Sequence, residues 1–256
     1  MTQGPYQQEI ESEEEFLSSR ANDILVMGED VELRSQAIDL QVRAAQYRFG
    51  YQQLWCGVPV IRLPEDILLL QEVIHEIRPS CIIETGVARG GSLLLSASLM
   101  EICGITPTVL GIDILILPHA VDAVAQSRYS RNIKLLETNS NSNESVRAIQ
   151  SLIRSQPANT PALLVLDSNH SHNHVLAELR YLATLLPLGS VVVVADTLIE
   201  FMPHDFYVGR PWSKGSNPLT ALQLFLSEND RFEPVTKWSR RGLISEVRDG
   251  IIRRVA

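Results

Sequence analysis

The chain has 256 residues, of which 45% are hydrophobic and 20% charged, a balance typical of a globular protein with one large core. This composition excludes collagen-like, coiled-coil and wholly disordered chains. Thirty acidic residues against 22 Lys and Arg leave a formal charge of −8, so we expect no large basic face for nucleic acid or anionic lipid. Three cysteines are an odd count and favour the reducing cytoplasm over a disulfide framework.

The N-terminal part is predicted to be an arm outside the main domain. Residues 1–16 lack the basic start and apolar stretch of a signal peptide, so we expect no export signal, no membrane-spanning helix and a cytoplasmic location. Residues 1–50 should form an acidic tip, disordered and solvated over 11–15, followed by a helical arm over 31–50 that Gly50 caps. The arm could pair across a two-fold axis in a homo-oligomer.

From residue 66 onward, short apolar runs rich in β-branched residues alternate with amphipathic stretches. This alternation predicts βαβ units and a parallel sheet with helices on both faces. The predicted strands are 81–84, 108–113, 133–137, 162–167 and 190–196, and the predicted helices include 66–77, 92–102, 173–186 and 220–229. Strand-like stretches over 232–238 and 243–255 follow, and the hairpin-like Asp249-Gly250 indicates an antiparallel edge.

The sharpest motif is ETGVARGGS, residues 84–92, which follows one predicted strand and opens a helix. Glycines let the backbone approach a ligand closely, and the helix start presents free N–H groups. The loop is neither a G-x-G-x-x-G fingerprint nor a P-loop. A strand-end acid followed by glycines suits S-adenosylmethionine, whose methionine part carries an ammonium and a carboxylate. A tight turn that merely needs glycine is the alternative.

The next predicted strand ends in Asp113, 29 residues after Glu84. A carboxylate at this position can accept hydrogen bonds from both ribose hydroxyls of a nucleoside cofactor. Capping of the following segment is the alternative role for this residue.

Two further strands end in acids, Asp167 and Asp196. Carboxylates at the ends of adjacent parallel strands can converge on one hard cation, which would lower the pKa of a substrate hydroxyl. His170 follows Asp167 closely and could accept the hydroxyl proton. Histidines also stand at 172 and 174, which leaves a zinc or iron site as a competing hypothesis.

These motifs occur in an order that is similar to one known family. The loop ETGVARGGS, the strand GIDI, the segment DSNHSHNHVLAEL, the strand end ADT and the stretch GSNPLTALQLFL before FEPVTKW together resemble the cephalosporin hydroxylase/rhamnosyl O-methyltransferase family over roughly residues 50–245. The resemblance implies an α/β fold over 51–256: a Rossmann-like, seven-stranded methyltransferase sheet, mostly parallel with an antiparallel C-terminal strand.

The resemblance also implies site roles. The residues expected to bind S-adenosylmethionine are Glu84, Thr85, Gly86, Gly90, Gly91, Ser92, Asp113, Asn139 and Ser140. Asp167 and Asp196 are expected to bind Mg²⁺, and His170 is expected to be the catalytic base. The chain departs from the family twice: Ala195 stands where a second metal carboxylate is usual, and Asn139 stands where an Asp is usual near the adenine. An amide can still hydrogen-bond adenine.

The predicted function is therefore methyl transfer from S-adenosylmethionine to a hydroxyl of a sugar or natural-product scaffold, assisted by Mg²⁺. A small-molecule acceptor is the expected partner. Trp212, Phe206 and Tyr207 could stack on it or simply pack. A non-haem-iron hydroxylase with two His ligands and one carboxylate is one rival. A non-catalytic cofactor-binding subunit is the other, favoured by Ala195.

Overall fold

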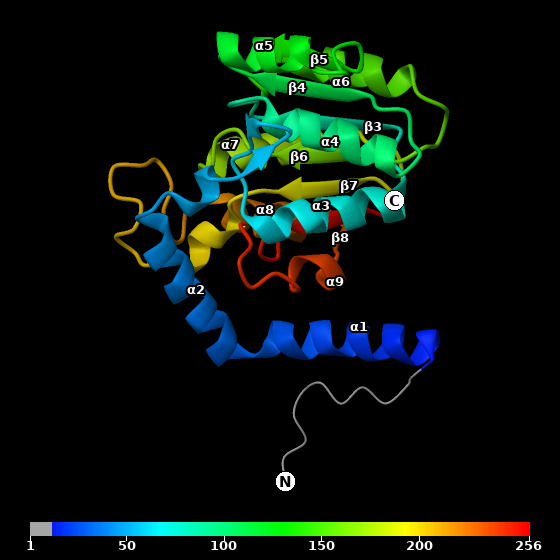
Figure 1. Ribbon diagram of the computed structural model, residues 1–256. Helices are drawn as coiled ribbons and strands as arrows, with labels where there is room; N and C mark the ends of the chain where they lie inside the picture. Colours follow the sequence, from blue (N-terminus) through cyan, green and yellow to red (C-terminus); the bar gives the residue numbers. More distant parts are fainter. Residues whose placement is uncertain (1–11) are drawn as a thin grey trace.

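The computed structural model describes residues 12–256 as a twisted sheet between two helical layers (Figure 1). Residues 1–11 of the predicted acidic tip lie outside the described residues. The strands of the main sheet are β3 (Cys81–Thr85), β4 (Val109–Asp113), β5 (Ile133–Glu137), β6 (Ala162–Leu166), β7 (Val191–Val194), β8 (Phe232–Pro234) and β9 (Ile251–Arg254).

These seven strands lie in the order β5-β4-β3-β6-β7-β9-β8. The first five positions are parallel, and β9 runs antiparallel to both β7 and β8. The predicted mostly parallel, seven-stranded sheet with an antiparallel C-terminal strand is confirmed. The chain order reverses beside β3, because β4 lies on one side and β6 on the other. In such sheets, ligands bind at the carboxyl ends of the strands next to this reversal.

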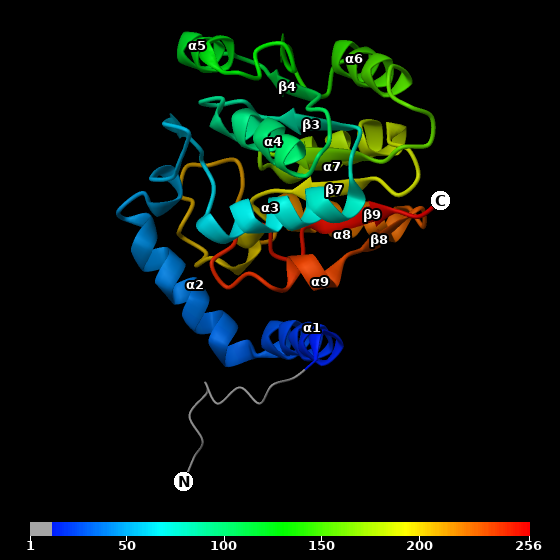
Figure 2. The same cartoon turned by 45° about the vertical axis from the view of Figure 1, so that its right-hand side comes forward.

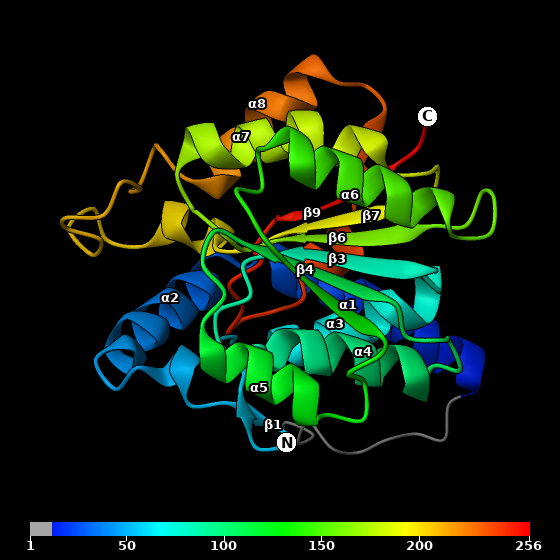
Figure 3. The same ribbon diagram turned by 90° about the horizontal axis from the view of Figure 1, so that it is seen from above.

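Helices cover both faces of the sheet, as Figure 3 shows. One layer contains α3 (Pro64–Ile77), α4 (Gly91–Ile102) and α5 (Pro118–Gln126); the other contains α6 (Asn143–Arg154), α7 (His172–Tyr181) and α8 (Pro218–Glu228). Neighbouring residues of β3 serve opposite layers: Ile82 belongs to the core under α3 and α4, and Ile83 to the core under α7 and α8. This two-sided burial explains the uninterrupted apolar runs in the sequence. Among residues 12–256, no helix combines the length and apolar character that a membrane crossing needs.

The N-terminal arm is a pair of helices, α1 (Glu13–Glu29) and α2 (Val31–Ala45). The prediction of disorder over 11–15 is wrong for the acids at 13–15. They form the first turn of α1, where Ser12 and Glu15 make a capping box and the helix dipole favours negative charge. The predicted helix over 31–50 is also too long. It stops at Ala45, and Arg48, not Gly50, takes the left-handed backbone before the short η1 (Phe49–Tyr51).

The arm lies along the C-terminal segment of the domain (Figure 2). Gln41 of α2 donates a hydrogen bond to the carbonyl of Leu243 at 2.9 Å, and Arg34 pairs with Asp249 at 3.5 Å. After the arm, a small hairpin of β1 (Leu54–Trp55) and β2 (Val58–Pro59) leads into α3. The chain thus enters the domain beside the carboxyl ends of the strands.

Three predicted elements are shorter than expected. The helix predicted over 173–186 ends at Tyr181 and continues as the 3₁₀ turn η2 (Ala183–Leu185), and a 3₁₀ turn η3 (Thr197–Phe201) follows β7. The strand predicted over 232–238 ends at Pro234, where α9 (Thr236–Ser239) begins. The strand predicted over 243–255 is limited to β9, and Asp249-Gly250 is a turn that enters β9. The backbone N–H groups of Leu243 and Glu246 donate to the carboxylates of Glu65 and Asp66 at the start of α3 instead of to a strand partner.

Candidate active site

A cavity of about 600 Å³ opens at the carboxyl ends of β3, β6 and β7. Backbone pairing continues past the strand ends: the Asp167 N–H donates to the Thr85 carbonyl at 2.9 Å, and the Ala195 N–H donates to the Leu166 carbonyl at 3.0 Å. This pairing places Asp167 beside Asp196, the residue after Ala195, and both line the cavity.

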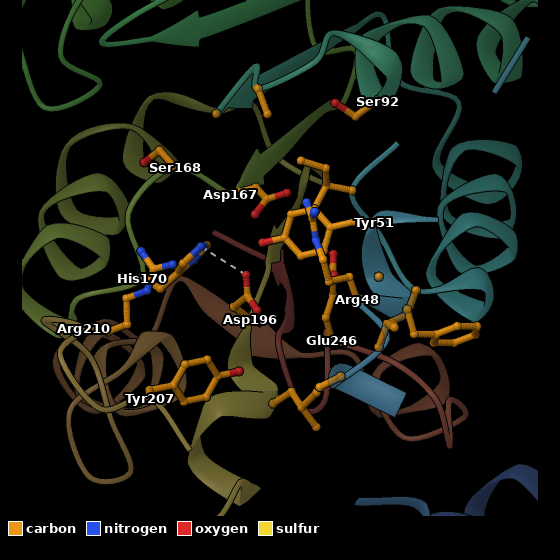
Figure 4. Close-up of a pocket in the computed structure, with 18 of the residues that line it drawn as sticks. Arg48, Tyr51, Ser92, Asp167, Ser168, His170, Asp196, Tyr207, Arg210 and Glu246 are labelled. Atoms are coloured by element: carbon orange, nitrogen blue, oxygen red, sulfur yellow. Dashed lines mark ion pairs between the residues drawn. The ribbon is translucent and has the colours of Figure 1, made fainter. Parts of the chain in front are cut away.

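Asp167, Asp196 and His170 form one cluster, as the sequence predicts. One donor atom from each lies within 4.8 Å of the others, and His170 Nε2 is 3.2 Å from Asp196 Oδ2 (Figure 4). Asp196 has a left-handed backbone, with φ of 55°, which turns its side chain back toward Asp167. Two carboxylates and an imidazole at this spacing can hold a divalent cation or move a proton.

The glycine-rich loop passes so close to the neighbouring strand end that side chains are excluded. A Cβ on Gly86 would stand 2.0 Å from the Asp167 carbonyl oxygen, and φ at this residue is +93°. A Cβ on Gly91 would stand 2.2 Å from the Pro59 carbonyl oxygen. Part of the glycine requirement is therefore tight packing within the protein, and the same packing leads the start of α4 to the cavity.

The Asp113 side chain binds the backbone of the same loop. Its Oδ2 accepts the backbone N–H of Val87 at 2.7 Å and that of Ala88 at 3.3 Å, and its Oδ1 accepts the N–H of Leu115. The local capping role considered for this acid is present in the structure. These bonds hold the loop at the end of β4, beside the region predicted for a ribose.

Asn139 and Ser140 lie in the turn after β5. The Asn139 side chain accepts the backbone N–H of Asn141, and Ser140 Oγ lies 3.0 Å from His174 Nε2. Ser168 Oγ lies 3.1 Å from the same nitrogen. His174 is thus part of a polar network between the ends of β5 and β6.

The predicted cofactor residues divide into two groups. Those that line the cavity are Glu84, Gly86, Gly91 and Ser92. Those outside its lining are Thr85, Gly90, Asp113, Asn139 and Ser140. Of the first group, Glu84 lies in β3, Gly86 follows it, and Gly91 and Ser92 begin α4. Of the second group, Asp113 ends β4, and Asn139 and Ser140 follow β5.

Arg62 is the central residue that sequence reasoning missed. It is 3% exposed, and its guanidinium contacts Glu84 at 3.5 Å, Asp167 at 3.4 Å and Glu246 at 3.2 Å. It thereby connects the predicted cofactor loop, the predicted metal site and the C-terminal segment. A lone Arg in the stretch PVIRLPED carries no signal for this role, because its three partners come from distant parts of the chain.

The cavity floor carries excess negative charge. The four acids Glu84, Asp167, Asp196 and Glu246 against the one guanidinium of Arg62 leave a formal charge of −3. Burial raises the pKa of Asp167 to about 7, although Arg62 acts in the opposite direction. Burial also raises the pKa values of Glu84 and Glu246. Such a floor favours cationic ligands, which would lower these pKa values again.

The three alternate histidines do not converge. His170 lies at Asp196, whereas His172 Nδ1 lies 2.8 Å from Thr220 Oγ1 and His174 belongs to the network around Ser140. In the described part of the chain, the one cluster with metal-ligand geometry has a single histidine. The geometry therefore contradicts the zinc or iron site built from several of these histidines, and the two-His triad of the hydroxylase rival.

The outer cavity wall comes from the segment between α2 and β1 and from the loop after η3. The first contributes Arg48 and Tyr51, and the loop contributes Tyr207, Arg210 and Trp212. Figure 4 shows Arg48 and Tyr51 on one side of the carboxylate cluster and Tyr207 and Arg210 on the other.

Of the predicted aromatic residues, Trp212 packs its ring edge-to-face with His170, with centroids 4.9 Å apart. Phe206 and Tyr207 pack edge-to-face on each other, also at 4.9 Å, and both line the cavity. These rings thus pack on protein groups while they remain part of the wall that an acceptor would meet.

Solved structures with this fold include a CmcI structure described as Mg-SAM. It has a TM-score of 0.59 and 22% identity, with 80% of this chain and 78% of that chain covered. An apo structure of CmcI has a TM-score of 0.56 and 21% identity, with 80% and 77% covered. The O-methyltransferase TomG from Streptomyces achromogenes, in complex with SAM, has a TM-score of 0.50 and 13% identity, with 96% and 100% covered. These likenesses support the methyltransferase fold.

Sequence comparison gives the family. Rhamnosyl O-methyltransferases of Mycobacterium bovis and Mycobacterium leprae are 33% identical over 150 residues, 58% of this chain. The match spans 58% and 62% of their lengths, less than two thirds. The family model described as Rhamnosyl O-methyltransferase/CmcI matches residues 47–255, most of the chain. The chain therefore belongs to the rhamnosyl O-methyltransferase/CmcI family.

Proposed function

We propose that the protein transfers a methyl group from S-adenosylmethionine to a hydroxyl oxygen of a small-molecule acceptor. The observation that carries this proposal is that one cavity joins Glu84 and Ser92 of the glycine-rich loop to the cluster of Asp167, His170 and Asp196. The names of the curated relatives, rhamnosyl O-methyltransferases, and the Mg-SAM form of CmcI support the same reaction.

The loop side of the cavity fits the methionine end of the donor. Both carboxylate oxygens of Glu84 are buried and receive no hydrogen bond, and the nearest cation is the Arg62 guanidinium at 3.5 Å. The ammonium of S-adenosylmethionine would supply the donors they lack. The N-terminus of α4, at Gly91 and Ser92, faces the cavity and suits the donor's carboxylate. Binding of the ribose by Asp113 and of the adenine by Asn139 remain predictions.

The carboxylate cluster fits a hard divalent cation. Asp167 and Asp196 offer oxygen ligands on a floor with excess negative charge, and Mg²⁺ prefers such ligands and retains several waters. A water can take the place of the carboxylate that Ala195 lacks. When bound, Mg²⁺ would orient the acceptor hydroxyl and lower its pKa.

His170 is proposed to accept the hydroxyl proton. Its Nε2 lies 3.2 Å from Asp196 Oδ2, and the Trp212 ring packs against the imidazole edge-to-face. As the proton moves to His170, the acceptor oxygen attacks the methyl carbon and the carbon–sulfur bond breaks, leaving S-adenosylhomocysteine. The role of the cavity walls is to align the oxygen, carbon and sulfur in one line.

The acceptor is proposed to be a sugar or a hydroxylated natural product. The word rhamnosyl in the names of the relatives points to a sugar hydroxyl, and the aromatic rings of Tyr51, Tyr207 and Trp212 in the wall suit a sugar face. The net charge of −8 is unfavourable for nucleic acid.

A non-catalytic, cofactor-binding role is the second candidate, and Ala195 is the observation that favours it. The deciding experiment combines calorimetric titration of S-adenosylhomocysteine with a methyl-transfer assay on a panel of sugars and hydroxylated metabolites, each with Mg²⁺ or with excess EDTA. Binding together with Mg²⁺-dependent transfer would support the enzyme. Binding without transfer to any panel member would support the subunit, and no binding at all would exclude both.

A further inference from the structure

The inner and outer parts of the cavity carry charges of opposite sign. Its floor holds the four carboxylates and Arg62, whereas its outer wall carries the exposed side chains of Arg48 and Arg210. Arg89 of the glycine-rich loop also lines the cavity. Arg48 comes from the turn between α2 and η1, and Arg210 comes from the loop after η3. Figure 4 shows both side chains reaching toward the cluster of Asp167, His170 and Asp196.

Neither wall arginine has an acidic partner. Within residues 12–256, no carboxylate lies within 4.0 Å of the guanidinium of Arg48 or Arg210, whereas Arg62 contacts three carboxylates. The charge of these two arginines is therefore not used to balance the floor. It is available to a ligand in the cavity.

Each wall arginine is held on an aromatic ring of the same wall. The Arg48 Cζ lies 5.0 Å from the centroid of the Tyr51 ring, and the Arg210 Cζ lies 5.5 Å from that of Trp212. A guanidinium that lies over an aromatic ring keeps N–H groups that can bind a ligand. Two such N–H groups match the two oxygens of a carboxylate or a phosphate.

The backbone at Arg48 is left-handed, with φ of 55°. This conformation costs a side-chain-bearing residue roughly 1–2 kcal/mol relative to the right-handed one. It is maintained by the bonds from Arg48 N to Ala45 O and from Tyr51 N to Arg48 O, both 2.8 Å. Strained residues that the surroundings hold in place tend to occur at ligand sites, and here the strain directs an arginine into the cavity wall.

We propose that Arg48 and Arg210 form an anion subsite, and that the acceptor is an acidic sugar or a related hydroxy acid. This inference rests on the proposed methyl transfer. Trp212 contacts both Arg210 and His170, so an anionic group at Arg210 lies near the hydroxyl whose proton His170 accepts.

The test measures binding by calorimetry with S-adenosylhomocysteine present. The probes are D-glucuronate, D-glucose 6-phosphate and neutral D-glucose, so that carboxylate and phosphate are compared on one scaffold. The variants are Arg48→Gln, Arg210→Gln and the double variant. Arg43→Gln is the matched control, because Arg43 is exposed on α2 and lies outside the cavity lining.

We expect at least one acidic probe to bind and D-glucose to bind at least tenfold more weakly. Each Arg→Gln change should weaken the acidic probe about tenfold or more, and Arg43→Gln should not. Preference for glucuronate or for the phosphate identifies the anion. Arg48→Lys, which retains the charge, should recover part of the loss, whereas a merely structural role would leave acidic and neutral probes equally affected.

Three results would overturn the anion subsite: equal binding of acidic and neutral probes, unchanged binding in the double variant, or no saturation by either acid up to roughly 50 mM. A separate titration of S-adenosylhomocysteine distinguishes the two proposals. If the acids bind and the cofactor product does not, methyl transfer fails and the anion subsite stands. If the product binds and the acids do not, only the anion subsite fails.

Discussion

The two sides of the cavity are built differently. On the donor side, Gly86 passes within contact distance of the Asp167 carbonyl, and Asp113 holds the backbone of Val87 and Ala88. On the acceptor side, Gly209 and Gly215 also have positive φ, but a Cβ on either would meet nothing within 4 Å. The donor side is thus constrained by its own backbone packing, whereas these two positions on the acceptor side have room for a side chain.

The largest effect should follow from adding one methyl group to the donor side. Gly86→Ala places a Cβ 2.0 Å from the Asp167 carbonyl at φ of +93°, and we expect a loss of about 3 kcal/mol or more in the free energy of unfolding. Gly209→Ala has φ of +80° and open space, so only the backbone cost of about 1 kcal/mol should remain. Urea unfolding measures both. Equal losses would remove the contrast between the two sides.

The second prediction concerns the proposed proton transfer to His170. His170→Ala should reduce turnover about 10²–10⁴-fold and leave the affinity for S-adenosylhomocysteine nearly unchanged, because the imidazole lies at Asp196 and Trp212, away from the glycine-rich loop. His172→Ala is the control, since His172 bonds Thr220. Steady-state kinetics and calorimetry provide the measurements. Similar turnover of the two variants would leave His170 without a special role.

The third prediction concerns the hydrogen bonds from the glycine-rich loop to Asp113. Asp113→Ala removes the acceptor for the Val87 and Ala88 N–H groups and the predicted ribose partner. We expect S-adenosylhomocysteine to bind more weakly by roughly 1.5–3 kcal/mol, with little change for an acidic probe on the acceptor side. Calorimetry with both ligands would show it. Weakening of both ligands alike would mean that the two sides are not independent.

The last prediction is a pH dependence of stability at the start of α3. Asp66 accepts hydrogen bonds from Ser245 Oγ and the Glu246 N–H, and burial raises its pKa to about 7. Because the folded state binds this proton more tightly than the unfolded one, the free energy of unfolding should fall as the pH rises from about 4 to about 7. Asp66→Asn should flatten part of that fall in denaturant titrations. A slope that the variant leaves unchanged would contradict the raised pKa.

Much of the donor side could be predicted from the sequence. The strand over 81–84, the glycines that follow it and the acids at the ends of later strands are local signals, and parallel pairing brings strand ends to one edge. The capping box at Ser12 and Glu15 is an equally local signal, S-x-x-E, which would have replaced disorder by a helix. The sequence did not predict that the C-terminal strand is so short. Residues 243–246 have β propensity, but their backbone N–H groups bind Glu65 and Asp66, which are remote in the chain, instead of a neighbouring strand.

By itself, the sequence determined the alternation of strands and helices, the glycine-rich loop and the acids at the strand ends, since these depend on periodicity and on short-range sterics. Only the tertiary structure decided that Arg62 joins Glu84, Asp167 and Glu246. It also decided that one histidine and not three reaches the cluster of Asp167 and Asp196, and that Arg48 and Arg210 line the same cavity. The physical reason is distance along the chain. Ion pairs, stacking and burial depend on which remote segments meet, and no local pattern encodes that meeting.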